Sequence, residues 1–249
     1  GWLSVRGARG GPLALSRQAF HPGINDTLGQ DPTGASFDPT VFSLFAAWQE
    51  LPDSPAFGAR KGVAAGERLF NSHPLFISGV RGLNDNPEVA AALGTSLPIA
   101  EIRGTCTTCH NTPNVGNHSL PLPLDIGTSH DPSNETDAQV AAAISRLSAP
   151  DVPVYEIGGC PNPFPDPRRP DASYVVYTTD PGKALITGLC SDVNRIKGPI
   201  LRGLAARAPF FHNGSARDVG EVVGFYDQRF RMSLSDEEKS QLAAFLNSV

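Results

Sequence analysis

Apolar residues that recur at helical spacing predict several short helices in this chain. The two nearest the C-terminus are the most regular, at 217–226 and 235–246. Ser215 precedes the first, and Ser235 with Glu238 gives the second a capping-box spacing, in which the two side chains satisfy backbone N–H groups at the helix start. Three further helices are predicted at 40–48, 62–71 and 136–147.

Strand patterns are scarce. The alternating run 173–179 predicts one strand, which allows a small hairpin but no large sheet. The 25 glycines and 23 prolines among 249 residues interrupt regular elements often. Residues 1–39 carry turn-forming residues at short intervals and are expected to form an extended arm. The sequence therefore predicts a mainly α fold with long loops and an irregular N-terminal arm.

Charge and hydropathy exclude two classes of partner. The chain has 20 basic and 25 acidic residues, a formal net charge of −5, and so lacks the dense basic surface that nucleic-acid binding needs. It also lacks a run of about 18 to 20 apolar residues, the length that crosses a bilayer. We therefore expect neither a nucleic-acid partner nor a membrane span.

Candidate chemistry is concentrated in Cys106-Thr-Thr-Cys109-His110. Two thiols at this spacing could form a redox disulfide or half of a zinc site, but the adjacent histidine completes the c-type haem attachment pattern. In that pattern two thioethers hold the porphyrin edge and the histidine is the proximal iron ligand. A redox dithiol would sit at a helix start after a buried strand, which 82–104 does not resemble. A zinc site would need a second cluster of ligands.

The motif also indicates a compartment. Haem of this type is attached outside the cytoplasm, so we expect a periplasmic or otherwise exported protein with one covalently bound haem c. An oxidising compartment suits a disulfide between Cys160 and Cys190, although two free buried thiols remain the alternative. Such a disulfide would close a loop of about 30 residues around the proline-rich segment 158–180.

The second axial ligand of the iron decides between functions, because a thioether favours electron transfer and an open position admits peroxide or oxygen. Met232, the sole methionine, is the leading candidate, with a packing role as the alternative. His118 is a second candidate, although its short distance from the motif favours the proximal side. His212 could bond a haem propionate or backbone carbonyls. The remaining histidines are expected to be surface or hydrogen-bonded residues: His21, His73 and His130.

Two further stretches carry a family resemblance. The run 201–215, Leu-Arg-Gly-Leu-Ala-Ala-Arg-Ala-Pro-Phe-Phe-His-Asn-Gly-Ser, is followed by 219–226 and by a last helix containing Leu-Ser-Asp-Glu-Glu-Lys. Together with the haem motif, this combination resembles the C-terminal haem domain of bacterial dihaem cytochrome c peroxidases and their relatives. The likeness covers roughly residues 60 to 249.

The resemblance implies a cytochrome c-like helical haem domain over 61–249, with an inserted loop at about 150–198 and with 1–60 as an arm and helix packed on it. His110 would be the proximal ligand and Met232 the ligand from the loop before the last helix; Arg202 and His212 would contact the haem. In cytochromes c a glycine and an aromatic residue four apart pack across the C-terminal helix. The matching residues here are Gly66, Phe70 and, as their partner, Phe245.

The number of haem motifs sets the expected function. The peroxidases use two C-x-x-C-H haems, one for electron entry and one for peroxide, whereas this sequence has one. We therefore expect a periplasmic monohaem c-type cytochrome that carries single electrons between protein partners. The alternative is a cytochrome c peroxidase-like enzyme acting on hydrogen peroxide, and the sequence leaves open whether the protein is an enzyme.

Overall fold

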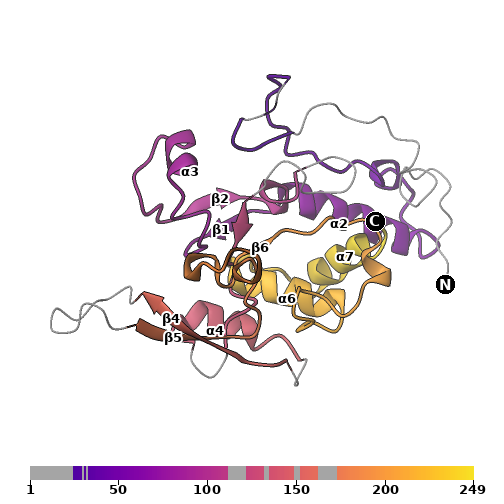
Figure 1. Cartoon of the computed structure of the whole chain (residues 1–249). Helices are drawn as coiled ribbons and strands as arrows, with labels where there is room; N and C mark the ends of the chain where they lie inside the picture. The colour runs from indigo at the N-terminus through magenta and orange to yellow at the C-terminus, as the bar shows by residue number, and fades with distance from the viewer. Residues whose placement is uncertain are drawn as a thin grey trace.

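Three helices form the centre of the computed structural model, which describes residues 25–29, 31, 33–111, 122–131, 135–148, 152–161 and 173–249. They are α2 (Gly58–Ser72), α6 (Val219–Arg229) and α7 (Asp236–Leu246), and all three were predicted (Figure 1). The capping box at Ser235 is confirmed. Helix α6 begins after Asp218 rather than after Ser215, because the Asp218 carboxylate accepts the Glu221 N–H at 2.9 Å.

The close crossing of α2 and α7 confirms the predicted glycine contact. A Cβ atom on Gly66 would lie 2.0 Å from the Gln241 carbonyl oxygen and 2.7 Å from Cβ of Phe245. The rings of Phe70 and Phe245 pack 5.6 Å apart. Only a glycine lets the two backbones approach this closely.

The predicted helix at 40–48 is wrong except for one 3₁₀ turn, η1 (Ala46–Trp48). Its large apolar residues are buried, but they are held in an irregular segment on α2. The side chain of Asn71 bonds both backbone groups of Phe42, and the Glu67 carboxylate accepts the Phe45 N–H with both oxygens at 3.1 Å. Side chains of α2 thus take the place of the backbone partners that a helix would supply.

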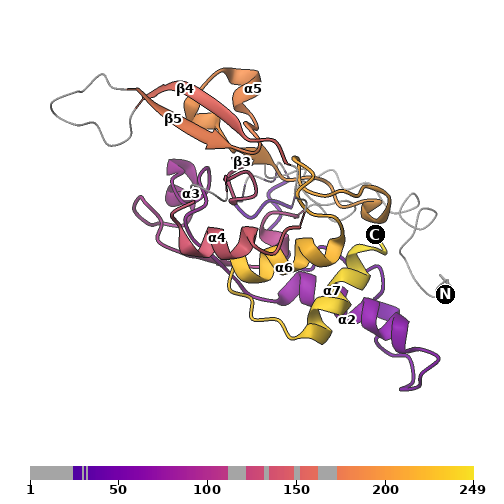
Figure 2. The same ribbon diagram turned by 90° about the horizontal axis from the view of Figure 1, so that it is seen from below.

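The other predicted helix, at 136–147, is confirmed in shorter form as α4 (Ala138–Ile144), capped by Asp137. It packs against α6 (Figure 2). The part of the chain that the structure describes also contains two small α-helices: α3 (Pro87–Ala92) and α5 (Ala184–Thr187).

Within the described residues, three two-stranded antiparallel sheets accompany the helices. Strand β1 (Leu75–Ile77) pairs with β2 (Ile102–Gly104), β3 (Pro123–Leu124) with β6 (Ile196–Lys197), and β4 (Tyr155–Pro161) with β5 (Ser173–Thr178). The predicted strand is confirmed as β5. The prediction of a mainly α, cytochrome c-like fold is wrong in class, since long connections between the helices pair their backbones as strands instead of remaining loops.

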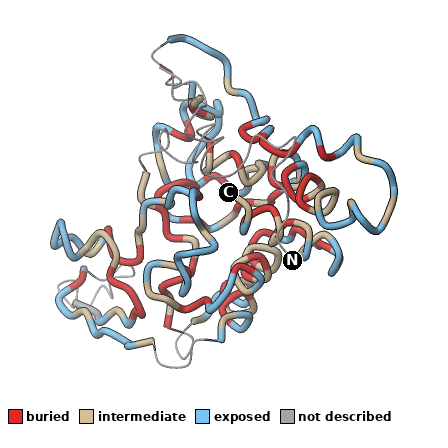
Figure 3. The backbone as a smooth tube through the Cα atoms, turned by 90° about the vertical axis from the view of Figure 1, so that its right-hand side faces the viewer, coloured by how far each residue is buried: buried red, intermediate tan, exposed pale blue. Residues whose placement is uncertain are grey.

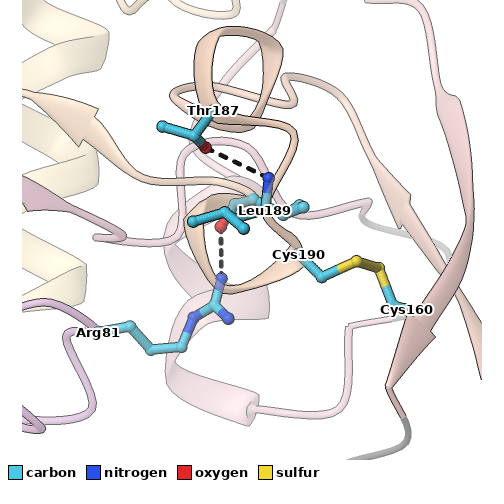
Figure 4. The surroundings of a disulfide bond; sticks show 6 residues. Arg81, Cys160, Thr187, Leu189 and Cys190 are labelled. Carbon is cyan, nitrogen blue, oxygen red and sulfur yellow. Dashed lines mark hydrogen bonds between the residues drawn. A yellow bond between two sulfur atoms is a disulfide. The ribbon is translucent and has the colours of Figure 1, made fainter.

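The segment predicted as an inserted loop contains the β4–β5 hairpin, which extends away from the central helices α2, α6 and α7 (Figure 2). The predicted disulfide is confirmed: Cys160 in β4 is bonded to Cys190 in the turn η3 (Cys190–Asp192), with Cα atoms 5.6 Å apart (Figure 4). Residues 152–161 and 173–193, which contain this hairpin and the disulfide, are called the lobe below. Arg81 donates to the Val193 carbonyl and so connects the lobe to the rest of the protein.

Buried residues line the contacts between the helices and the segments that cover them (Figure 3). The predicted arm falls largely outside the described residues; of its described part, Asn25 donates to the Asn111 carbonyl at 2.9 Å, directly beside the haem motif. Among the residues that the structure describes, no helix is long and apolar enough to cross a membrane.

Candidate functional site

A cavity of about 390 Å³ lies where α2, α6 and α7 meet the strands β1, β3 and β6. Its wall is mostly aliphatic and aromatic, which suits a large, flat, apolar ligand. The apolar lining includes Phe70, Leu75, Leu124, Leu201, Phe210, Val223, Phe230, Leu242 and Leu246.

All three residues of the haem motif line this cavity: Cys106, Cys109 and His110. They stand on a single tight turn, η2 (Cys106–Thr108), in which the His110 N–H donates to the Cys106 carbonyl at 3.0 Å. Thr105 and Thr108 close the turn with a capping box. The two cysteines are not bonded to each other or to another cysteine, so neither sulfur is used in a disulfide.

Burial controls the protonation of all three groups. It raises the pKa of Cys106 to about 12 and that of Cys109 to about 11, which keeps both as neutral thiols at neutral pH. Burial lowers the pKa of His110 to about 4, although the nearby Pro199 carbonyl acts in the opposite direction. The imidazole is therefore neutral, the form that binds a metal.

The His110 ring is buried, and the Pro199 carbonyl lies close enough to raise its pKa against the effect of burial. A neutral imidazole in a cavity wall beside two thiols fits a site completed by a ligand. The residues present fit haem c: two thiols for attachment, a neutral imidazole for the iron and an apolar enclosure.

Met232 lines the same cavity and is 5% exposed. It is held in the short connection between α6 and α7 by both of its backbone groups. Its N–H donates to the Asp227 carbonyl at 3.0 Å, and His73 Nε2 donates to its carbonyl at 2.9 Å. The structure thus brings the predicted proximal and distal ligands to one cavity.

Tyr226 was missed by the sequence analysis. It lines the cavity, and burial raises the pKa of its phenol with a further contribution from the two nearby thiols. A tyrosine oxygen is an established haem iron ligand. The signal that could have found it is helical spacing, because the α6 residues on the cavity wall recur three and four positions apart: Val219, Val222, Val223 and Tyr226.

The basic residues at the cavity differ from the predicted set. His212 lines the cavity, whereas Arg202 is exposed and is not part of the lining. Two other cations line it instead: Lys197 from β6 and Arg207, which donates to the Ile200 carbonyl. Both could bind the propionates of a haem.

The other histidines fall into three groups. His21 and His118 lie outside the described residues. His73 is hydrogen-bonded to Met232, as described above. His130 bonds Asp125 at 3.0 Å through Nε2 and Glu135 through Nδ1, and these carboxylates raise its pKa against the opposing effect of burial. The prediction of hydrogen-bonded histidines is thus confirmed for His73 and His130.

A buried arginine holds the cavity wall together. Arg229 is 2% exposed and donates to the Ile126 and Ser78 carbonyls, both at 2.9 Å. Ile126 lines the cavity, and Ser78 follows β1. Arg229 therefore fixes the end of α6 to two wall segments.

No cluster for a metal ion accompanies the cavity. Across the described ranges, no group of three or more histidine, cysteine, aspartate or glutamate side chains is arranged to hold a metal. Cys160 and Cys190, which a zinc site would have needed, are bonded to each other.

Comparison with known proteins gives one informative similarity. The chain is 29% identical over 154 residues to the cytochrome-c peroxidase IdrP2 of Denitromonas iodatirespirans. The chain is thus similar to a cytochrome-c peroxidase. The match covers 59% of this chain and 36% of that peroxidase, so the chain spans well under half of its relative. No protein-family model matches the sequence, and no solved structure matches it.

Proposed function

We propose that this protein is a c-type haem protein of the cytochrome c peroxidase type, which reduces hydrogen peroxide with electrons from a protein donor. One observation carries the proposal: the thiols of Cys106 and Cys109 and the neutral imidazole of His110 all line one apolar cavity. The similarity to a cytochrome-c peroxidase supports the choice of reaction.

The residues of the cavity have distinct roles in this proposal. Cys106 and Cys109 would hold one haem covalently, and His110 would bind its iron. Lys197 and Arg207 pair with the propionates. When bound, the haem supplies one-electron redox chemistry, while the apolar wall excludes bulk water and tunes the potential.

The location and the partner belong to the same proposal. Haem attachment of this type and the Cys160–Cys190 disulfide are both made outside the cytoplasm, which supports a periplasmic or otherwise exported protein. Reduction of one peroxide needs two electrons. A single haem passes the electrons one at a time, so a one-electron donor protein must dock to this protein twice for each peroxide that is reduced.

A second function, single-electron transfer without substrate chemistry, is favoured by Met232. A thioether bound to the iron raises the reduction potential and occupies the position that peroxide needs. Met232 faces the cavity from a connection fixed at both backbone groups, as a permanent ligand would be.

Co-expression with a haem c maturation system tests the proposal at its base. The purified protein is expected to keep its haem after acid–acetone extraction, and its mass is expected to include one tetrapyrrole. The double variant Cys106→Ala/Cys109→Ala should lose both properties. His110→Gln should change the haem spectrum, and His130→Gln is the matched histidine control that should not. Loss of all colour on extraction of the wild type contradicts the proposal.

The ferric spectrum and its response to peroxide then separate the two functions. A high-spin spectrum with a rapid reaction with hydrogen peroxide supports the peroxidase. A low-spin spectrum with the long-wavelength band of methionine ligation, lost in Met232→Ala and kept in Tyr226→Phe, supports the electron carrier. The reverse pattern in these two variants would assign the ligand to Tyr226.

A further inference from the structure

His212 and Asp180 form a hydrogen-bonded pair at the solvent-exposed edge of the cavity. His212 Nδ1 lies 2.5 Å from Asp180 Oδ2. The His212 side chain is 61% exposed and lines the cavity, whereas the Asp180 side chain is 6% exposed. The imidazole is thus in contact with both solvent and the cavity, and its partner is buried.

The carboxylate is fixed by its own neighbours. Asp180 Oδ1 accepts the Gly182 N–H at 2.8 Å, and the Asp180 N–H donates to Thr178 Oγ1 at 3.0 Å. Thr178 is the last residue of β5, and the disulfide bonds the partner strand β4 to Cys190. The β4–β5 hairpin therefore positions Asp180 at the cavity edge. The segment predicted as an inserted loop therefore contributes one half of the pair.

The imidazole is fixed from both sides along the chain. Phe211 has a left-handed backbone (φ +61°), and its ring packs 5.1 Å from Phe225. The Asn213 side-chain amide donates to the Thr128 carbonyl and to Thr179 Oγ1, both at 3.0 Å. Because Phe211 and Asn213 are both held by residues distant in the sequence, the backbone of His212 is fixed next to Asp180.

The pairing sets the chemistry of the ring. A carboxylate only accepts hydrogen bonds, so Nδ1 of His212 carries the hydrogen and Nε2 is the nitrogen that exchanges protons. No residue in the described part of the chain hydrogen-bonds to Nε2. The charged side chains that share the cavity wall are the cations Lys197 and Arg207.

We propose that His212, oriented by Asp180, is the proton-transfer residue of this cavity. The inference rests on the proposed function, since it requires a haem in the cavity. Hydrogen peroxide, two protons and two electrons from the donor protein give two waters. His212 Nε2 takes a proton from one peroxide oxygen and delivers it to the other as the O–O bond breaks. Solvent supplies the two protons consumed. Asp180 is a positioning residue.

Ligand binding tests the proposal without turnover. Hydrogen cyanide must lose its proton to bind ferric iron as the anion, whereas imidazole binds without losing one. In the ferric holoprotein, His212→Gln is expected to slow cyanide association about 100-fold and to leave imidazole association within about threefold, since positioned acid–base groups typically contribute 10²- to 10⁴-fold. The ratio of the two rates cancels any displacement of an internal ligand.

Two further variants complete the experiment. Asp180→Asn should reduce the same ratio by a smaller factor, because the single amide oxygen must serve both donors that the carboxylate accepts, His212 Nδ1 and the Gly182 N–H, and so positions the ring less well. His130→Gln is the matched control: His130 is also paired with carboxylates but is not among the cavity-lining residues, so its ratio should equal that of the wild type. Haem content and the ferric spectrum establish that each variant is correctly assembled.

The outcomes distinguish this inference from the function on which it rests. An unchanged ratio in His212→Gln, or an equal loss for cyanide and imidazole, overturns the proton-transfer role and leaves the haem proposal standing. A His212→Gln variant that changes only the haem content or the reduction potential identifies a propionate contact instead, and also overturns it. A reduced ratio in His212→Gln, together with a wild type that does not consume peroxide, supports the proton-transfer role of the pair and contradicts the peroxidase function.

Discussion

Gly66 of α2 lies against the backbone carbonyl of Gln241 in α7, so closely that a Cβ atom on Gly66 would be 2.0 Å from that oxygen. Gly66→Ala must therefore push the two helices apart. Overpacking of a close-packed site typically costs about 1 to 3 kcal/mol in the free energy of unfolding, and the rigid obstacle here places the cost at the upper end. Chemical denaturation of the holoprotein measures it.

The control for this variant lies in the same helix. A Cβ atom on Gly62 would meet nothing within 4 Å. Since alanine is a better helix former than glycine by about 1 kcal/mol, Gly62→Ala should stabilise the protein slightly. Equal effects of the two substitutions would show that the backbone contact at Gly66 carries no cost.

The features that sequence alone revealed are those encoded locally. The haem motif places Cys106 and His110 on one turn whatever surrounds it, and the periodicity of 235–246 with its capping box defines a helix by itself. The crossing of Gly66 with Phe245 was accessible only through family resemblance, because nothing in the local pattern names a partner that far along the chain.

The features that were missed depend on distant partners. The segment 40–48 has a helical pattern, but Glu67 and Asn71 of α2 bind its backbone and impose another conformation. Strand β1 has three residues and strand β3 has two, and both are too short to show an alternating pattern in the sequence. At the cavity the run 201–215 contains several basic residues, and only the path of the chain shows that Arg207 reaches the wall while Arg202 does not.

Glu67 makes the stability of the protein pH-dependent. Burial raises its pKa from 4.5 to about 7, although the N–H groups of Phe45 and Leu44 favour the charged form. The folded state thus binds a proton more tightly than the unfolded state, so the carboxyl contributes stability that is complete below about pH 4.5 and is lost as the pH rises to about 7. The shift corresponds to about 3 kcal/mol.

Glu67→Gln isolates this contribution. Glutamine stays neutral and can still accept the Phe45 N–H, so the difference in unfolding free energy between wild type and variant should change between pH 4.5 and 7 and be constant above. Glu50→Gln, on an exposed side chain, serves as the control. Parallel curves for wild type and Glu67→Gln would contradict the prediction.

The Cys160–Cys190 disulfide is expected to stabilise the lobe that carries Asp180. The two residues are 30 positions apart, and closing a loop of that length restricts the unfolded chain by about 3 to 4 kcal/mol. Cys160→Ser/Cys190→Ser should lower the free energy of unfolding by about this amount. Protease cleavage in the hairpin region should rise, while α2, α6 and α7 remain protected from hydrogen exchange. Uniform loss of protection across these helices would show that the lobe is not a separate unit.

The connection that holds Met232 is under backbone strain. Its neighbours Arg231 (φ +51°) and Ser233 (φ +57°) both adopt the left-handed region, which costs a residue other than glycine roughly 1 to 2 kcal/mol. His73 opposes that strain through its bond to the Met232 carbonyl. Removing this donor in His73→Ala should lower the unfolding free energy by about 1 kcal/mol and let Met232 leave the cavity more often.

Spectroscopy gives the readout for this last change. Where Met232 binds the iron, His73→Ala should weaken the methionine band as the temperature rises, well below the temperature of global unfolding, and should lower the reduction potential. Ser233→Gly removes one source of strain and should retain the band over a wider range than the wild type. If His73→Ala retains the wild-type band up to global unfolding, the hydrogen bond to the Met232 carbonyl does not hold the ligand, and the fixed position of Met232 must come from the Asp227 carbonyl and the apolar wall around it.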